Sequence, residues 1–423
     1  MPDFTETTYR QALGDGLVLR SAASAQDVER VAQFNGVIHG PGIVPMTRSL
    51  FLDHPNTSGR DLIFVEDEKS GQVVSSLCLI PWTLRYEDVL IPAGEMAIVG
   101  TLEAYRRRGL VRAQVGFFKQ RLRERGCLLS HIQGIPYYYR QFGYEYALPL
   151  ESGLRLELRH VPKPPDDQFT FRLATLEDLP GLVRLYDEAA QDLGISTVRD
   201  EDIWRYLLQH TQGSEMESEK WLIEDSRGNV VGYAVLPTSH FGAELTVSEV
   251  SRLSFDAALA LLNHLKVRAE QLGKPGIRLN IPPNCSLMQV ARPFTDHEYS
   301  TYAWQICVPD MVALLRALAP VFERRIARSL FAGLTREVPI CLYRETIALR
   351  FAKGKLADVA SLGNEAGSGG INVPPLQFIP LVLGYRSIEE LHHTYPDVSV
   401  APSQHLLADN LFPKVKSFLY TIY

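Results

Sequence analysis

The strongest constraint on the fold is an internal repeat, because the first and second thirds of the chain carry the same order of apolar segments. In each third an apolar segment precedes an aspartate and a helical pattern, at residues 17–22 and at residues 169–174. Two apolar segments joined by a turn with glycine follow, at residues 65–74 and 223–231. The repeat predicts two copies of one unit and the fold class α/β (α+β).

The two copies differ where a strand turns into a helix. In the first copy, the apolar stretch 96–101 leads through Arg106-Arg107-Arg108-Gly109-Leu110-Val111 into a helical pattern that ends at Gly126. The first turn of a helix leaves backbone N–H groups without acceptors, and these groups attract an anion together with the helix dipole. Eight Lys or Arg and one acid lie between Tyr105 and Gly126, although the net charge of the chain is −6. This local positive charge predicts a site for a pyrophosphate.

The corresponding stretch of the second copy is residues 247–255, which contain no glycine and no cluster of arginines. The phosphate site is therefore assigned to residues 96–112 of the first copy. From the local run alone, clustered arginines before a helix can also be no more than a solvated face, and this alternative stays open. An apolar stripe at helical spacing after the run favours the phosphate site, because it would pack the helix on a sheet.

The length of 423 residues predicts two to four domains, and the changes of pattern along the chain favour three. Residues 1–160 form the first, residues 161–167 a proline-rich linker, residues 168–302 the second and residues 303–423 the third. In the third domain we expect a helical region over residues 310–329 that is broken at Pro320. The expected strands of this domain are residues 304–308, 339–343 and 347–351, and the expected surface loop is residues 363–370.

Composition limits the classes of partner and compartment. The chain is 46% hydrophobic and 22% charged, so no attraction to nucleic acid or to acidic membranes is expected. The five cysteines are scattered and lack the spacing of a disulfide framework or a zinc site, and no metal is predicted. Residues 1–20 carry acids and no long apolar stretch, so we expect neither a signal peptide nor a transmembrane helix, and the expected location is the cytoplasm.

The order of strand, basic glycine turn, helix and strand, followed by Phe142-Gly143-Tyr144, resembles the GNAT superfamily of acetyl-CoA-dependent N-acetyltransferases. The family signature is Arg or Gln, two residues, Gly, one residue, then Gly or Ala. Arg106 and Gly109 meet this signature, whereas Val111 departs from its last position. The whole chain resembles the enhanced-intracellular-survival (Eis) type. This resemblance implies tandem GNAT-like mixed sheets flanked by helices, the second degenerate, followed by an α+β sterol-carrier-protein-like domain.

The resemblance also implies roles for individual residues of the first domain. Backbone groups of Ile98, Val99 and Thr101 would pair with the pantetheine arm of acetyl-CoA, although Thr101 departs from the usual Val. The phosphates would be held by five residues of the basic turn and the helix that follows, Arg106, Arg107, Gly109, Leu110 and Arg112. Tyr139 falls on the tyrosine that serves this family as general acid toward the leaving thiolate. A phenol, with a reference pKa of about 10, suits a proton donor at neutral pH, but a buried tyrosine can also only pack.

In such enzymes the C-terminal carboxylate, here that of Tyr423, reaches the active site as general base. Residues 417–423 have no charged side chain and four large apolar or aromatic groups before Tyr423, so we expect this tail to dock on the rest of the chain. A tail of this kind could instead dock only to complete the core of the third domain, and this alternative stays open.

The predicted function is acetyl transfer from acetyl-CoA to a primary amine of a small polycationic acceptor, of the aminoglycoside or polyamine type. The acceptor part rests on the resemblance, which also implies a homo-oligomer, often a hexamer. We expect the acceptor between the first two domains, near a long loop predicted at residues 35–59 that contains His39, Asp53 and His54. Two alternatives stay open, namely an acyl-CoA or lipid sensor without turnover and an acetyltransferase acting on a protein lysine or N-terminus.

Overall fold

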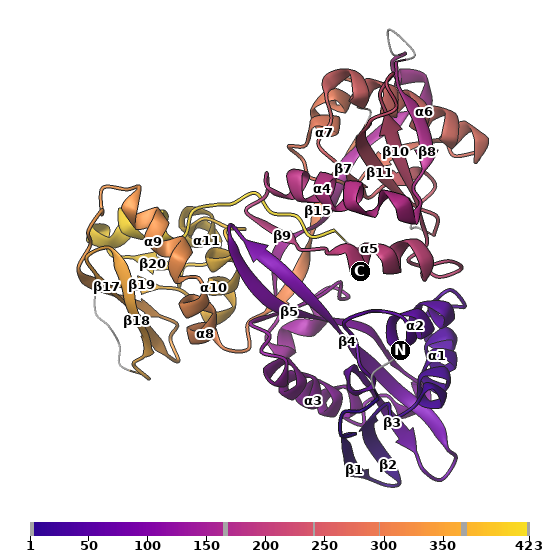
Figure 1. Cartoon of the computed structure of the whole chain (residues 1–423). Coiled ribbons are helices and arrows are strands. Elements are labelled where there is room, and N and C mark those ends of the chain that lie inside the picture. The colour runs from indigo at the N-terminus through magenta and orange to yellow at the C-terminus, as the bar shows by residue number, and fades with distance from the viewer. Residues whose placement is uncertain (1–3, 164–167, 240–241, 296, 365–369, 421–423) are drawn as a thin grey trace.

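The computed structural model describes residues 4–163, 168–239, 242–295, 297–364 and 370–420, which are arranged in three lobes (Figure 1). Their strands form one sheet of 11 strands, one of four and one of five, and helices flank these sheets. The fold class predicted from the repeat, α/β with mixed sheets, is confirmed. No domain boundary is tested by this arrangement, so the predicted boundaries stay predictions.

The first lobe surrounds one end of the large sheet. Its elements in chain order are β1 (Arg10–Gly14), β2 (Leu17–Ser21), α1 (Ala25–His39), α2 (Ile43–Leu52), β3 (Leu62–Asp67), β4 (Gln72–Tyr86), β5 (Val89–Thr101), α3 (Leu110–Glu124), β6 (Leu129–Ile132) and β7 (Glu145–Glu157). Side chains alternate between the two faces of β3. Leu62 and Phe64 pack with α1 and α2, whereas Ile63 and Val65 pack with α3. The sheet is thus covered on both faces.

The long loop predicted at residues 35–59 is wrong, because most of these residues belong to α1 and α2. Only Gly40, Pro41 and Gly42 separate the two helices. Ile43, Met46 and Leu50 recur at spacings of three and four and are buried, which makes residues 43–52 an amphipathic helix. The glycines and proline mark a short turn and not a loop.

The second lobe shares part of the order of elements found in the first. Its elements are β8 (Thr170–Leu173), α4 (Leu179–Ala190), β9 (Ile195–Thr197), α5 (Glu201–Gln209), β10 (Ser218–Glu224), β11 (Val230–Pro237), β12 (Leu245–Val247), β13 (Glu249–Val250), α6 (Phe255–Gln271), β14 (Gly276–Leu279), α7 (Ser286–Ala291) and β15 (His297–Cys307). In both lobes an antiparallel hairpin, β3–β4 or β10–β11, precedes a parallel pair that encloses a helix, β5–β6 or β12–β14. The predicted hairpins are confirmed.

One sheet crosses from the first lobe into the second. β7 pairs with both β14 and β15, and β15 lies between β6 and β7. The strand predicted at residues 304–308 for the third domain is therefore the end of β15, which joins the large sheet. β15 also runs across residue 302, where the second domain was predicted to end.

The third lobe holds the five-stranded sheet. Its elements are α8 (Met311–Ala317), α9 (Ala319–Ala327), β16 (Arg336–Cys341), β17 (Thr346–Ala352), β18 (Lys355–Ser361), β19 (Ile371–Asn372), α10 (Pro375–Val382), α11 (Ile388–Thr394), β20 (Ser399–Val400) and α12 (His405–Leu411). The predicted helix break is confirmed, since Pro320 lies in the first turn of α9, where no backbone N–H is needed. Residues 365–369 of the predicted glycine loop lie outside the described residues.

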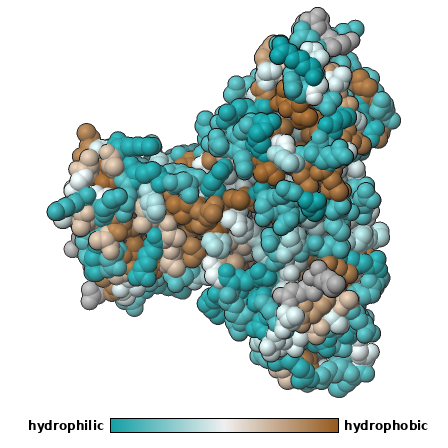
Figure 2. Space-filling view, viewed as in Figure 1, coloured by the Kyte–Doolittle hydropathy of each residue, from teal (hydrophilic) through white to brown (hydrophobic). Residues whose placement is uncertain are grey.

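The tip of the hairpin formed by β4 and β5 contacts the third lobe (Figure 1). The hydroxyl of Tyr86 donates a hydrogen bond of 2.9 Å to the carbonyl of Val382 in α10. Glu87 accepts from Arg324 at 2.9 Å and from Arg325 at 2.8 Å. On the face shown in Figure 2, hydrophilic residues dominate the outer rim, and hydrophobic residues gather toward the junctions between the lobes.

The C-terminal tail leaves the third lobe and crosses to the second, which confirms that it docks. The N–H of Phe418 donates to the carbonyl of Ile195 at 3.1 Å, and Phe418 and Tyr420 are buried against α4 and α5. The Tyr420 ring lies 5.8 Å from the guanidinium carbon of Arg199. The tail therefore does more than complete the third lobe, whose main core it joins through Leu419. Tyr423, the predicted general base, lies outside the described residues.

Two absences apply to the described residues. None of their helices combines the length and the hydropathy that are needed to span a membrane. In the same part of the chain, no three His, Cys, Asp or Glu side chains are grouped so that they could hold a metal ion.

Candidate active site

The site begins where two parallel strands separate. β5 and β6 pair through Ala93–Glu95 and Leu129–His131. The register between β4 and β5 shifts between Cys78 and Ser76, and Ile98 takes a φ of 50° at this bulge. A bulge bends a strand, so β5 turns away from its neighbour beyond Glu95. Two pockets open on this side of the sheet.

The first pocket, called the donor pocket here, has a volume of about 530 Å³ and is lined by the basic turn. Seven of the eight residues predicted to bind the donor substrate line it, namely Val99, Thr101, Arg106, Arg107, Gly109, Leu110 and Arg112. The side chain of Ile98 lies in the wall of the neighbouring pocket. The predicted role of Ile98 uses its backbone groups, which lie at the bulge. This role therefore does not depend on the direction of its side chain.

The basic turn is built to face an anion. Gly109 has a φ of 76°, which favours glycine, and it stands directly before the first turn of α3 without a side-chain cap. Arg106 and Arg107 are exposed, and neither has a carboxylate partner within the described residues. Among the described residues, Arg112 donates one hydrogen bond, to the side-chain oxygen of Gln141 at 3.3 Å. The free N–H groups of α3 and these guanidinium groups fit a pyrophosphate.

Two arginines at the C-terminal end of α3 are paired with a buried carboxylate. Arg121 donates to Asp61 at 2.8 Å, Arg125 also pairs with Asp61, and the Asp61 side chain is fully buried. Of the basic stretch between Tyr105 and Gly126, the N-terminal end borders the donor pocket, whereas Arg121 and Arg125 are held by Asp61. The predicted stripe, Val111, Val115, Phe118 and Leu122, lies on one face of α3. Val115, Phe118 and Leu122 are buried, and Val111 is partly buried.

The second pocket, called the acceptor pocket, lies between the first and second lobes and has a volume of about 570 Å³. α1 and α2 contribute His39 and Met46, and the second lobe contributes Ser248 and Asn280. Three carboxylates line it, those of Glu95, Glu151 and Glu215, against one guanidinium, that of Arg278, which lies 3.1 Å from Glu151. This excess of acid favours a cationic ligand.

Two residues expected near the acceptor lie elsewhere. Asp53 faces the ring of His210 at 3.5 Å. His54 is buried beside Tyr206, at 4.8 Å between ring centres, and burial lowers the pKa of His54 to about 4. Neither lines the acceptor pocket, because α2 turns this part of the chain toward α5. Of the three named residues, only His39 is placed as expected.

Tyr139 stands where the two pockets meet, since it lines both of them. It belongs to the 3-10 helix η3 (Tyr138–Phe142), and only 5% of its surface is exposed. Burial raises the pKa of its hydroxyl, so the group stays protonated at neutral pH. Within the described residues the hydroxyl makes no hydrogen bond, and its proton is free for a ligand.

Sequence reasoning did not single out Glu95, which lines the acceptor pocket, or the buried His131 beside it. Their side chains lie 3.7 Å apart on adjacent strands at the point of separation, and both are buried. The His131 ring stands between Trp82 and Trp304, and burial lowers the pKa of His131 to about 3. A single carboxylate within the apolar stretch of β5 was the one signal that could have pointed to Glu95.

This geometry agrees with comparisons to known proteins. Residues 48–147 match the family model described as an acetyltransferase (GNAT) domain. The match includes the basic turn and Tyr139. The chain contains a GNAT acetyltransferase domain. No curated protein matches the sequence.

Solved structures are similar to the whole chain and not only to its GNAT domain. A conserved protein of unknown function from Enterococcus faecalis V583, described as a probable N-acyltransferase, matches with a TM-score of 0.72 at 14% identity, over 99% of each chain. A GCN5-related N-acetyltransferase from Anabaena variabilis matches with a TM-score of 0.69 at 15% identity, over 96% of this chain and all of that one. Eis1 from Mycobacterium abscessus matches with a TM-score of 0.64 at 18% identity, over 96% of this chain and all of that one. At these identities the likeness concerns the fold.

Proposed function

We propose that the protein transfers an acetyl group from acetyl-CoA to a primary amine of a small polycationic acceptor, of the aminoglycoside or polyamine type. The observation that carries the proposal is the place of Tyr139, a buried residue whose hydroxyl makes no hydrogen bond within the described residues. It stands between a pocket lined by arginines and a pocket with an excess of carboxylates. A proton donor at this junction can serve a reaction between an anionic donor and a cationic acceptor.

The donor substrate would lie along β5, held by Arg106, Arg107 and Arg112 and by the N-terminus of α3. The register shift leaves Ile98 and Val99 without paired residues on β4, and their backbone groups would receive its extended arm. The fit is supported by the absence of competing carboxylates at these guanidinium groups within the described residues. The match to a GNAT domain, which includes the basic turn, supports the same placement.

The chemistry needs one proton acceptor and one proton donor. The amine of the acceptor must be neutral to attack the thioester carbonyl carbon, and we assign the removal of its proton to the carboxylate of Tyr423. The C–N bond forms, the C–S bond breaks, and Tyr139 donates its proton to the leaving thiolate. The tail supports this assignment only up to Tyr420, which is buried next to α4 and α5.

The other lobes have supporting roles in this proposal. The second lobe would be a GNAT-like unit that lost its donor site, because residues 247–255 form β13 and its flanks with no basic turn. It would instead supply one wall of the acceptor pocket and the seat of the tail. The third lobe would be sterol-carrier-like, and the assembly a homo-oligomer.

The test is release of free thiol from acetyl-CoA by the purified protein with a panel of aminoglycosides and polyamines. We expect thiol release that depends on the amine and saturates with it. Binding of acetyl-CoA without release across the panel would replace the proposal with the sensor function. Release only with peptides that bear lysine or a free N-terminus would point to a protein acetyltransferase.

A further inference from the structure

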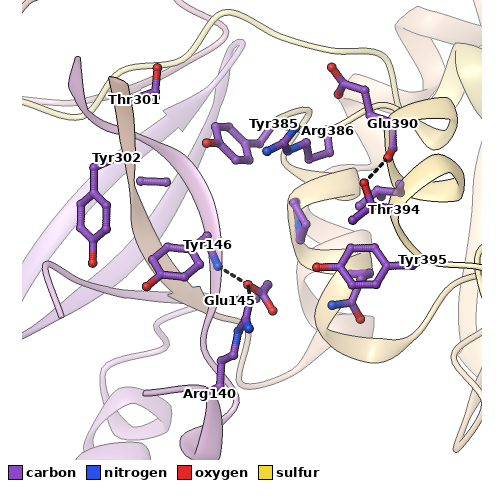
Figure 3. A pocket seen from close by; sticks show the side chains of 14 residues that line it. Arg140, Glu145, Tyr146, Thr301, Tyr302, Tyr385, Arg386, Glu390, Thr394 and Tyr395 are labelled. Atoms are coloured by element: carbon purple, nitrogen blue, oxygen red, sulfur yellow. Dashed lines mark hydrogen bonds and ion pairs between the residues drawn. The ribbon is translucent and has the colours of Figure 1, made fainter. Parts of the chain in front are cut away.

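A third pocket lies between the large sheet and the helices of the third lobe (Figure 3). Its volume of about 330 Å³ is at the lower end of the range of small-molecule sites, about 300–1,000 Å³. β7 and β15 contribute Glu145, Tyr146 and Tyr302 to one wall. Residues in and around α10 and α11 contribute the facing wall, which includes Tyr385 and Tyr395. Neither the donor nor the acceptor of the proposed reaction would reach this pocket, because it shares no lining residue with theirs.

Of the four charged side chains that line this pocket, three form an ion pair, and Arg386 forms none within the described residues. Arg140 pairs with Glu145 at 2.7 Å, and Glu390 pairs with Lys414 at 2.7 Å. Arg386, which is exposed, has no carboxylate partner within the described part of the chain, and its guanidinium carbon lies 5.4 Å from the centre of the Tyr385 ring. A guanidinium group held on an aromatic ring retains its donors for a planar carboxylate.

The remaining walls are aromatic. Tyr146 and Tyr302 pack edge to face, with ring centres 5.7 Å apart. Together with Tyr385 and Tyr395 they present flat apolar surfaces beside hydroxyl groups, and Pro380 and Leu391 add apolar surface. Aromatic rings pack well on such walls, and an aliphatic polycation would find no free carboxylate here.

From these observations we propose that this pocket is a second ligand site, which binds a small aromatic carboxylate. The carboxylate pairs with Arg386, and the ring packs among the tyrosines. The inference does not depend on the proposed acetyl transfer.

A ligand in this pocket would contact two tyrosines that form hydrogen bonds to the segment before Tyr139. The hydroxyl of Tyr302 donates to the carbonyl of Gly134 at 2.9 Å, and the hydroxyl of Tyr146 accepts from the N–H of Tyr137 at 3.2 Å. Residues 134–139 lead to Tyr139, so the walls of this pocket hold the segment that carries the proton donor. The site is therefore placed to act on the GNAT domain.

Calorimetric titration of the full chain with benzoate and 4-hydroxybenzoate tests the site. We expect saturable binding, with benzamide, the neutral analogue, at least roughly tenfold weaker because it cannot form the ion pair. Arg386→Gln should weaken benzoate binding by roughly tenfold or more. Arg336→Gln, which removes an exposed arginine of the same lobe outside the pocket, should bind like the unchanged chain.

A charge reversal keeps the test decisive. Arg386→Glu should abolish benzoate binding and create binding of benzylamine, which a misfolded variant would not do. No saturable binding of either carboxylate up to about 10 mM, equal binding of benzamide, or an unchanged affinity in Arg386→Gln would each overturn the proposal. Benzoate binding that acetyl-CoA displaces and that Arg386→Gln leaves intact would place the anion in the donor pocket and overturn it as well.

Discussion

The ring of Tyr139 packs directly on Gly134, so closely that a β-carbon added at Gly134 would lie 2.3 Å from Cδ2 of the ring. We expect Gly134→Ala to move the phenol away from the junction of the two pockets and to lower kcat by roughly tenfold or more, because catalysis depends on the position of the donor. The matched control is Gly116→Ala in α3, which has open space around it and should keep full activity. Equal thiol release by both variants would contradict the role of this contact.

Changing Tyr139 to Phe removes the hydroxyl and keeps the ring. We expect kcat to fall by roughly 10²–10⁴, the usual contribution of a general acid, with little change in the affinity for acetyl-CoA. Tyr137→Phe removes the hydroxyl of a neighbour that is exposed on the same segment and should change neither value. Steady-state thiol release and calorimetry separate the two effects, and an unaffected rate in Tyr139→Phe would remove this residue from the mechanism.

Replacement of Arg107 by Gln should weaken acetyl-CoA binding by roughly tenfold, since a charge-assisted hydrogen bond to a phosphate contributes about 1.5–3 kcal/mol. The loss should be larger at low salt than at high salt because salt screens an exposed charge. Arg123→Gln, an exposed arginine of α3 outside the donor pocket, serves as control. If both variants bind acetyl-CoA alike, the phosphates lie elsewhere.

A short peptide added after Tyr423 should cripple turnover while acetyl-CoA binding stays the same. The carboxylate would no longer end the tail, whereas the donor pocket does not involve the tail. Thiol release and calorimetry on the extended chain check both expectations. Full activity of the extended chain would rule out the carboxylate of Tyr423 as the base and turn attention to Glu95, which lines the acceptor pocket.

Stability should fall in mild acid. Burial lowers the pKa of His131 to about 3 and that of His54 to about 4, from an ordinary value of 6.5. Their neutral forms are kept in the folded chain, so stability is complete above pH 6.5 and decreases as the pH falls toward 4, by up to about 1.4 kcal/mol per pH unit for each histidine.

Denaturation in guanidinium chloride at pH 7 and at pH 5 measures this loss. His54→Gln should show a smaller difference between the two pH values than the unchanged chain, and His393→Gln, at an exposed position of α11, should show the same difference. An identical pH dependence in all three chains would refute the contribution of His54.

Much of the first lobe could be predicted from local patterns. The stripe Val115, Phe118 and Leu122 predicted α3, and the positive φ of Gly126 stops the helix where glycine was read as its end. The prediction of a long loop failed because glycine and proline mark a change of chain direction but do not show how long the connecting segment is. Residues 43–52 were assigned to a loop for this reason, although their own apolar spacing is helical.

Sequence alone determined the elements that depend on near neighbours, namely the two hairpins, the basic turn before α3 and the position of Tyr139 in a turn ahead of Phe142. Only the tertiary structure decided which of these groups meet. Asp61 withdraws Arg121 and Arg125 from the basic stretch, and β15 enters the sheet between β6 and β7. The reason is physical. Helices and turns are set by contacts within about four residues, whereas strand pairing and buried ion pairs depend on which distant partner satisfies a backbone group or a charge.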